Sequence, residues 1–181
     1  MTTIQKYLER DLAADVILKT RKRNVNERSQ LEKITLNIGV KEANANSNKI
    51  LPPLLLLKLL TQQQPVCTKA KKSIANFKLR EGKIIGCKVT LRNNKMKGFL
   101  EKLVHIIIPQ IIESKKQRYK NRRPTNQLSL GVGDCNIFFE LENLYDLLPG
   151  TYGLSITLSS QEDKILNIDK LFYSGLKIKF Q

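Results

Sequence analysis

Residues 68–92 read TKAKKSIANFKLREGKIIGCKVTLR, a cationic stretch that runs into an alternating segment. Eight Lys or Arg side chains lie between Lys69 and Arg92, against the single acid Glu81. Residues 84–91 begin two residues after Gly82 and alternate between apolar and polar positions, as in a half-buried strand. The stretch therefore predicts a loop at 73–82 and a strand at 84–91. Together with the three residues before it, it also predicts a short extended segment at 65–69.

The remaining segments predict helices packed on a sheet. Alternation over 31–38 predicts a strand whose polar face holds Lys33, Thr35 and Asn37. Apolar residues at intervals of three and four predict helices at 3–20, 46–63 and 94–112. In the second helix Pro52 and Pro53 fit only the first turn, and in the third Pro109 is expected to bend or stop the helix. Further strands are expected at 127–132, 137–141, 152–159 and 176–180, and a short helix at 163–173.

These elements predict a single α+β domain over residues 1–181, largely an antiparallel sheet with helices packed on one face. Its projecting parts are the loop at 73–82 and a basic loop at 113–125. In the latter, KKQRYKNRR at 115–123 holds six cations and no apolar periodicity.

The charge of the chain predicts a polyanionic partner. There are 32 Lys or Arg against 16 Asp or Glu, a formal net charge of +16. Residues 124–163 contain acids but no Lys or Arg, so one face should be basic and another neutral or acidic. The side chains expected to contact the phosphates of a nucleic-acid partner in general are Lys71, Lys72, Lys88, Arg118, Lys120, Arg122 and Arg123.

Motifs for nucleotide, hydrolase or metalloprotease chemistry are missing from the sequence, and we predict no metal, cofactor or enzymatic activity. The single histidine, His105, is expected to be a core or groove residue and not a ligand or catalytic base. The three cysteines have no CxxC spacing and are expected to be reduced and mostly buried. Two classes of protein stay open as alternatives to a non-enzymatic protein that binds a polyanion. One is a basic RNA-processing or RNA-modifying enzyme, with Glu140 and Glu142 on one strand face as metal-binding carboxylates. The other is a membrane-surface adaptor held by residues 115–123.

Three blocks resemble the ribosomal protein L5 family, the large-subunit proteins that bind 5S ribosomal RNA in the central protuberance. They are LEKITLNIGVKEA at 31–43, QQPVCTKAKKSIANFKLREGKIIGCKVTLR at 63–92 and GLSITL at 153–158. The resemblance runs nearly end to end. The segments after Pro109 and after Gly131 depart from the family pattern, so no role is transferred to Gly133 or Asp134.

The resemblance implies two sites. One binds 5S RNA and contains Asn37, Gln63, Thr68, Lys69, Thr90 and Arg92. The other is the loop at 73–82, which in the family projects toward the elbow of the tRNA in the peptidyl site and here contains Ser73, Asn76, Phe77, Lys78, Arg80 and Gly82. Burial of Phe77 in the core stays open as the alternative.

The resemblance also implies further partners and a location. The partners are large-subunit RNA, neighbouring proteins of the central protuberance and a small-subunit protein across the subunit interface, with no membrane. Glu9, Asp11 and Asp15 do not fit a cleavable presequence. Frequent Asn, Lys and Ile indicate A+T-rich codons. We therefore expect an organelle-encoded protein of the mitochondrial ribosome in the matrix, with a bacterial cytoplasm or a plastid as alternatives.

Overall fold

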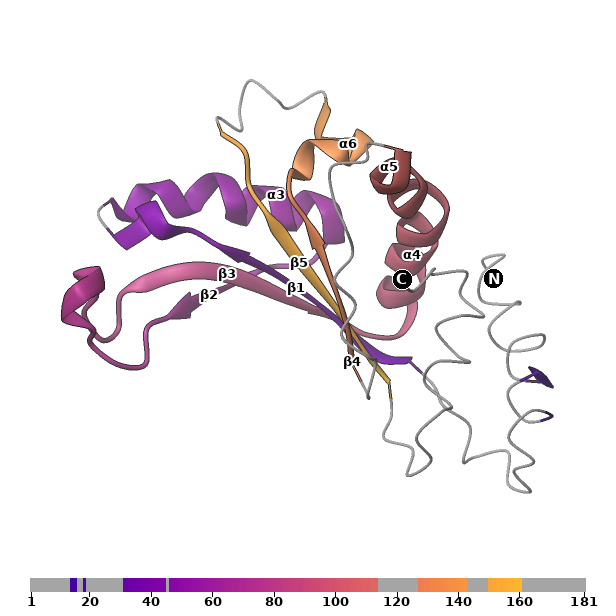
Figure 1. The fold of residues 1–181 in the computed structure, drawn as a ribbon, viewed down its shortest axis with the longest axis horizontal. Helices are drawn as coiled ribbons and strands as arrows, with labels where there is room; N and C mark the ends of the chain where they lie inside the picture. The colour runs from indigo at the N-terminus through magenta and orange to yellow at the C-terminus, as the bar shows by residue number, and fades with distance from the viewer. Residues whose placement is uncertain are drawn as a thin grey trace. The chain divides into compact units, whose positions relative to one another are not determined.

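The computed structural model of the chain describes residues 14, 15, 18, 31–44, 46–113, 127–142 and 150–160. Five strands form one sheet in the order β2-β3-β1-β5-β4 (Figure 1). The strands are β1 (Leu31–Gly39), β2 (Val66–Lys69), β3 (Ile84–Leu91), β4 (Gln127–Val132) and β5 (Leu154–Ser160). The predicted α+β class with a largely antiparallel sheet is confirmed.

The chain divides into two compact units. Unit 1 comprises Met1–Ile34, Leu91–Leu130 and Thr157–Gln181, and unit 2 comprises Thr35–Thr90 and Gly131–Ile156. Strands β1, β3, β4 and β5 each contribute residues to both units. A single domain with the boundaries 1–181 remains a prediction.

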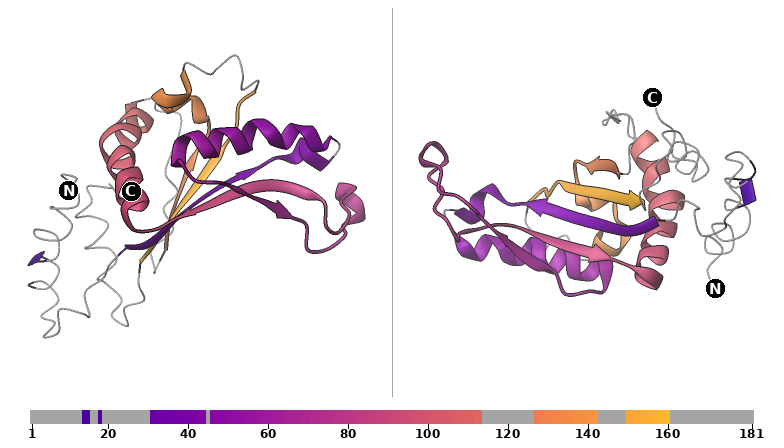
Figure 2. Two further views of the ribbon diagram at one scale, coloured as in Figure 1. Left: turned by 180° about the vertical axis from the view of Figure 1, so that it is seen from behind. Right: turned by 90° about the horizontal axis from the view of Figure 1, so that it is seen from below.

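In unit 2, helix α3 (Leu51–Thr61) runs alongside β1 and β3 (Figures 1 and 2). The short 3-10 helices η3 (Lys41–Asn44) and η4 (Ser47–Ile50) precede it. Pro52 and Pro53 lie in its first turn, where their missing N–H groups would have no helical partner. The helix therefore begins after the predicted residue 46. Its inward side chains, Leu56, Leu57 and Leu60, are almost completely buried.

The prediction of a strand at 137–141 is wrong. The backbone there forms the 3-10 helix η7 (Cys135–Ile137) and the short helix α6 (Phe139–Glu142). Phe138 and Leu141, three residues apart, are both buried, and the Leu141 N–H donates to the Phe138 carbonyl at 2.9 Å. The burial thus follows a helical interval, and Glu140 and Glu142 do not lie together on one strand face.

In unit 1, α4 (Asn93–Lys102), the π-helical segment η6 (Leu103–Ile107) and α5 (Ile108–Glu113) follow one another without a break. Pro109 does not stop the helix, which continues to Glu113. A proline cannot donate to the carbonyl four residues earlier, and the wider π turn lies just before it. His105 is exposed, so it is not a core residue. Within the described ranges, helices are too short or too polar to cross a membrane.

Some predicted segments lie outside the described residues. They are most of the helix at 3–20, the basic loop after Glu113 with Arg118, Lys120, Arg122 and Arg123, the helix at 163–173 and the strand at 176–180. Of the first helix, Ala14, Asp15 and Leu18 are described and are helical.

Candidate nucleic-acid interface

The strands of unit 2 have one buried and one accessible face. On β1, Leu36 and Ile38 are completely buried whereas Asn37 is exposed, and on β3 the same contrast separates Cys87 and Val89 from Lys88. Strands β2 and β3 are antiparallel, with Val66 opposite Lys88 and Thr68 opposite Gly86. Opposed residues share a face. We define the open face of unit 2 as the accessible side chains of Thr35, Asn37, Val66, Thr68, Lys88 and Thr90.

The open face brings together three residues predicted to bind 5S RNA, namely Asn37, Thr68 and Thr90. They come from the neighbouring strands β1, β2 and β3. Their amide and hydroxyl groups can both donate and accept hydrogen bonds. Lys88 adds a cation on the same face. This combination suits the sugars and phosphates of RNA better than the base edges.

Gln63 is bonded to the backbone at the end of β3. Helix α3 ends at Thr61, and Gln62 follows in the left-handed conformation with φ 51°. The Thr61 hydroxyl then accepts the Gln63 N–H at 3.3 Å. The Gln63 Nε2 donates to the Thr90 carbonyl at 3.1 Å. One of its donors is therefore used within the protein, and its side chain positions the end of β3 as well as offering an acceptor.

Gly86 permits the close packing of β1, β2 and β3 beneath Thr68. The Val40 N–H donates to the Ile85 carbonyl at 2.9 Å, which holds β1 against β3. A Cβ on Gly86 would overlap the Ile38 carbonyl oxygen and lie 3.1 Å from the Thr68 Oγ1. No role was predicted for Gly86 from the sequence. The available signal was a glycine inside a strand pattern, which indicates a close backbone approach.

The hairpin loop, residues 70–83, has an ordered backbone. Ile74 and Leu79 exchange two backbone hydrogen bonds of 3.0 and 3.1 Å across its neck. The 3-10 turn η5 (Ala75–Phe77) forms its tip, and Lys78 follows with φ 52°. At its base the Ala70 N–H donates to the Lys83 carbonyl, and the Gly82 N–H donates to the Ala70 carbonyl. Gly82 itself has a positive φ of 80°. These bonds give the loop a defined shape.

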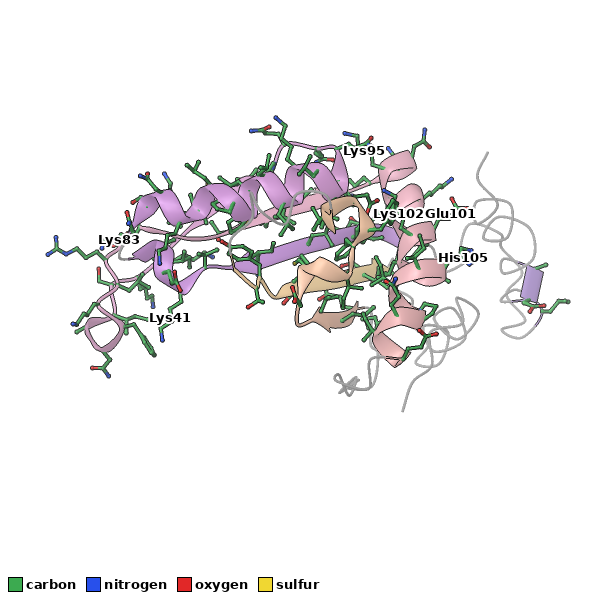
Figure 3. All side chains as sticks on the ribbon, turned by 90° about the horizontal axis from the view of Figure 1, so that it is seen from above. Lys41, Lys83, Lys95, Glu101, Lys102 and His105 are labelled. Atoms are coloured by element: carbon green, nitrogen blue, oxygen red, sulfur yellow. The ribbon has the colours of Figure 1, made fainter. Side chains whose placement is uncertain are left out.

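The hairpin loop presents an aromatic ring among cations. Phe77 is 70% exposed, so burial of this side chain in the core is excluded. Ile74, at the neck of the loop, is 43% exposed. The exposed cations of the loop are Lys71, Lys72, Lys78, Arg80 and Lys83, and Glu81 is its one acid. Lys41, for which no role was predicted, lies at the same end of unit 2 as Lys83 (Figure 3).

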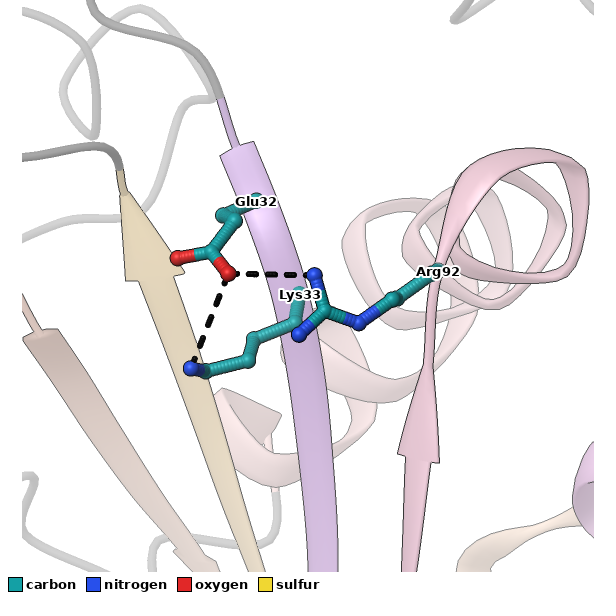
Figure 4. A network of polar contacts seen from close by, with 3 residues as sticks. All are labelled: Glu32, Lys33 and Arg92. Atoms are coloured by element: carbon teal, nitrogen blue, oxygen red, sulfur yellow. Dashed lines mark hydrogen bonds and ion pairs between the residues drawn. The ribbon is translucent and has the colours of Figure 1, made fainter.

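Arg92 belongs to unit 1, where it is part of a network with Glu32 and Lys33 (Figure 4). Its Nη1 donates to the Glu32 Oε1 at 3.0 Å, and the Lys33 Nζ lies 3.7 Å from the same oxygen. Side chains this exposed gain little from pairing, about 0–1 kcal/mol. The pair can therefore open for a phosphate at small cost. A 5S RNA contact by Arg92 remains a prediction.

Groups of three or more His, Cys, Asp or Glu side chains placed to hold a metal do not occur among the residues that the structure describes. The described side chains of the candidate interface in unit 2 include hydrogen-bonding groups, cations and the exposed ring of Phe77.

The sequence matches a known family over most of its length. Residues 24–80 match the family described as Ribosomal protein L5, and residues 84–180 match the separate model of that family's C-terminus. The Large ribosomal subunit protein uL5m of Reclinomonas americana is 39% identical over 158 residues, 87% of each chain. The Large ribosomal subunit protein uL5 of Clostridium botulinum is 38% identical over 156 residues, 86% of each chain. That of Clostridium kluyveri is 35% identical over 172 residues, 93% of this chain and 94% of its own. This chain belongs to the ribosomal protein L5 family.

Proposed function

We propose that the open face of unit 2 binds 5S ribosomal RNA in the central protuberance of the large subunit. The observation that carries the proposal is the meeting of Asn37, Thr68 and Thr90 on one accessible sheet face, with Gln63 bonded to Thr90. Neutral donors and acceptors recognise the 2′-hydroxyl and the backbone shape of RNA. Lys88 adds a positive charge on this face, and Lys69, the exposed residue after Thr68 on β2, adds a second one nearby.

Family membership supports this function over the alternatives. The chain is a structural constituent of the large ribosomal subunit and not an enzyme, and ribosomal RNA and ribosomal proteins are its partners. Contacts with neighbouring proteins of the central protuberance and with a small-subunit protein are further parts of the proposal.

The first test removes neutral hydrogen-bonding groups from the open face. We expect Asn37→Ala and Thr90→Ala each to weaken binding of the cognate 5S RNA by about 1 kcal/mol, the value of one interfacial hydrogen bond. The dependence of affinity on salt should stay the same, because no cation is removed. Filter binding over a series of salt concentrations measures both quantities.

Gln63→Ala should behave differently from those two variants. It removes the donor to the Thr90 carbonyl, so we expect it to lower the free energy of unfolding by about 1 kcal/mol in addition to weakening RNA binding. Gln64→Ala is the matched control, since Gln64 is the adjacent exposed glutamine and should change neither quantity. Unchanged RNA affinity in the triple variant of Asn37, Gln63 and Thr90 would refute the assignment of the open face.

The hairpin loop is the second part of the proposal, as a contact for the elbow of the tRNA in the peptidyl site. An exposed ring offers a stacking surface to a base or a ribose, and Lys78 and Arg80 attract phosphate. The backbone hydrogen bonds of the loop support this role, because they hold Phe77 outward in a defined place.

The test combines Phe77→Ala, Lys78→Asn and Arg80→Ala. Asparagine is chosen at residue 78 because it tolerates the φ of 52° better than alanine does. We expect the variant to assemble into large subunits but to release tRNA from the peptidyl site faster, by roughly the 1–3 kcal/mol of one stacking interaction. Purified particles with verified stoichiometry, and tRNA dissociation followed over time, provide the measurement. Normal dissociation would reject the tRNA role, and failed assembly would move the loop to a structural one.

The ribosome that contains this protein is proposed to be mitochondrial. The support is the frequent Asn, Lys and Ile, which A+T-rich codons encode, together with the similarity to the uL5m protein of Reclinomonas americana. Bacterial uL5 proteins are almost as similar, so a bacterial or plastid ribosome is the alternative. Co-sedimentation of the protein with large subunits from purified mitochondria distinguishes these origins.

A further inference from the structure

Two cysteines that are distant in the sequence face each other across the edge of the sheet. Cys67 on β2 and Cys87 on β3 are directly opposed partners in the antiparallel ladder. Opposed residues have Cα atoms about 4.5–5.5 Å apart and side chains on the same face. Disulfides join Cα atoms about 4.4–6.8 Å apart. Both residues are free thiols, and the spacing typical of opposed residues falls within the range that a disulfide spans.

The two thiols differ in their access to solvent. Strand β2 lies at the edge of the sheet, and Cys67 is partly exposed there, whereas Cys87 is completely buried. Burial, with a smaller contribution from Cys67, raises the pKa of the Cys87 thiol to about 12. Cys135 is also buried, and its pKa is raised to about 12 mainly by burial, then by Asp134 and Cys87. A soluble oxidant therefore reaches Cys67 first.

We propose that Cys67 and Cys87 are a modification site, where a hydroperoxide converts the thiol pair into a reversible disulfide. The Cys67 thiol loses its proton, the sulfur attacks one peroxide oxygen, the O–O bond breaks, and the leaving hydroxide takes up a proton, so that a sulfenic acid and one water form. The Cys87 sulfur then attacks the sulfenic sulfur, loses its proton and releases the second water. Two electrons pass from the two sulfurs to the peroxide, so two thiols and one hydrogen peroxide give one disulfide and two waters.

The bond would join β2 to β3 at the base of the hairpin loop. It lies on the buried side of the sheet, since Cys87 alternates with the exposed Lys88. Thr68, Lys88 and Thr90 stay accessible on the open face, so oxidation fixes the strand pair without covering the proposed RNA site. In a reducing compartment the pair returns to two thiols.

The test treats the reduced full-length chain with hydrogen peroxide, removes the peroxide, unfolds the chain in guanidinium chloride, and only then blocks the remaining thiols with N-ethylmaleimide, because Cys87 and Cys135 are buried in the folded chain. Trypsin digestion without reductant should yield the peptide 59–69 joined to the peptide 84–88, which contain Cys67 and Cys87 respectively. We expect two of the three thiols to escape blocking and dithiothreitol to restore both. The readout is the mass of the joined peptides, which does not depend on RNA binding.

Two variants control the experiment. Cys135→Ala should still form the linked peptides, and Cys67→Ser should not. Circular dichroism before oxidation verifies that both variants are folded. Any of three results would overturn the proposal. They are a Cys87–Cys135 bond, a linkage between two copies of the chain, and sulfinic acid at Cys67 together with N-ethylmaleimide on Cys87.

Discussion

Gly86→Ala is expected to lower the free energy of unfolding by about 1–3 kcal/mol, the range for forcing an extra methyl group into a packed site. The added Cβ would overlap the carbonyl oxygen of Ile38 and approach the Gly39 Cα to 3.3 Å. Both neighbours are backbone atoms of β1, so relief requires β1 and β3 to move apart. Denaturant unfolding of the purified chain measures the loss.

The same substitution should also weaken 5S RNA binding, because the new methyl group would press on the Thr68 hydroxyl of the open face. Gly131→Ala is the matched control. This glycine also lies in a strand, and a Cβ there would meet no atom within 4 Å. Equal denaturation midpoints for Gly86→Ala and the unsubstituted chain would contradict the close packing of β1 on β3.

Replacing Lys69, Lys71, Lys72 and Lys88 together by glutamine is expected to have the largest effect on RNA affinity. All four side chains are exposed in unit 2, on β2, on β3 or at the start of the hairpin loop. Log affinity falls linearly as log salt rises. Each phosphate that is no longer neutralised makes the steepness of this fall smaller by about 0.7–0.9. Removing four such neutralising cations would weaken binding by roughly two to three orders of magnitude near ~0.15 M salt.

Charge alone could produce part of this effect, so the control removes the same number of cations elsewhere. Lys58 lies on α3, and Lys95, Lys97 and Lys102 lie on α4. Their fourfold replacement by glutamine lowers the net charge equally, and we expect most of the 5S RNA affinity and the salt slope to be retained. Equal losses in the two variants would show that net charge, and not the proposed interface, controls binding.

Alternation and apolar spacing predicted β1, β3 and β4 closely, because burial on one side of a strand or helix leaves a local period in the sequence. The same reasoning misassigned 137–141. Ile137, Phe138 and Leu141 fit a short apolar strand as well as one helical turn, and in so short a segment periodicity does not separate the two. The sequence also gave no sign of the π turn before Pro109, which lets the helix continue past the proline.

The composition and the blocks at 31–43 and 63–92 were enough to predict an RNA-binding ribosomal protein and to select Asn37, Gln63, Thr68 and Thr90. Only the tertiary structure showed that Gln63 bonds to the Thr90 carbonyl, 27 residues later, and that Cys67 faces Cys87. Only the tertiary structure also showed why residue 86 is a glycine, since a side chain there would overlap the Ile38 carbonyl oxygen. A local pattern determines which face of a strand a residue occupies, whereas its neighbours depend on strand order and register, and these are set by long-range packing.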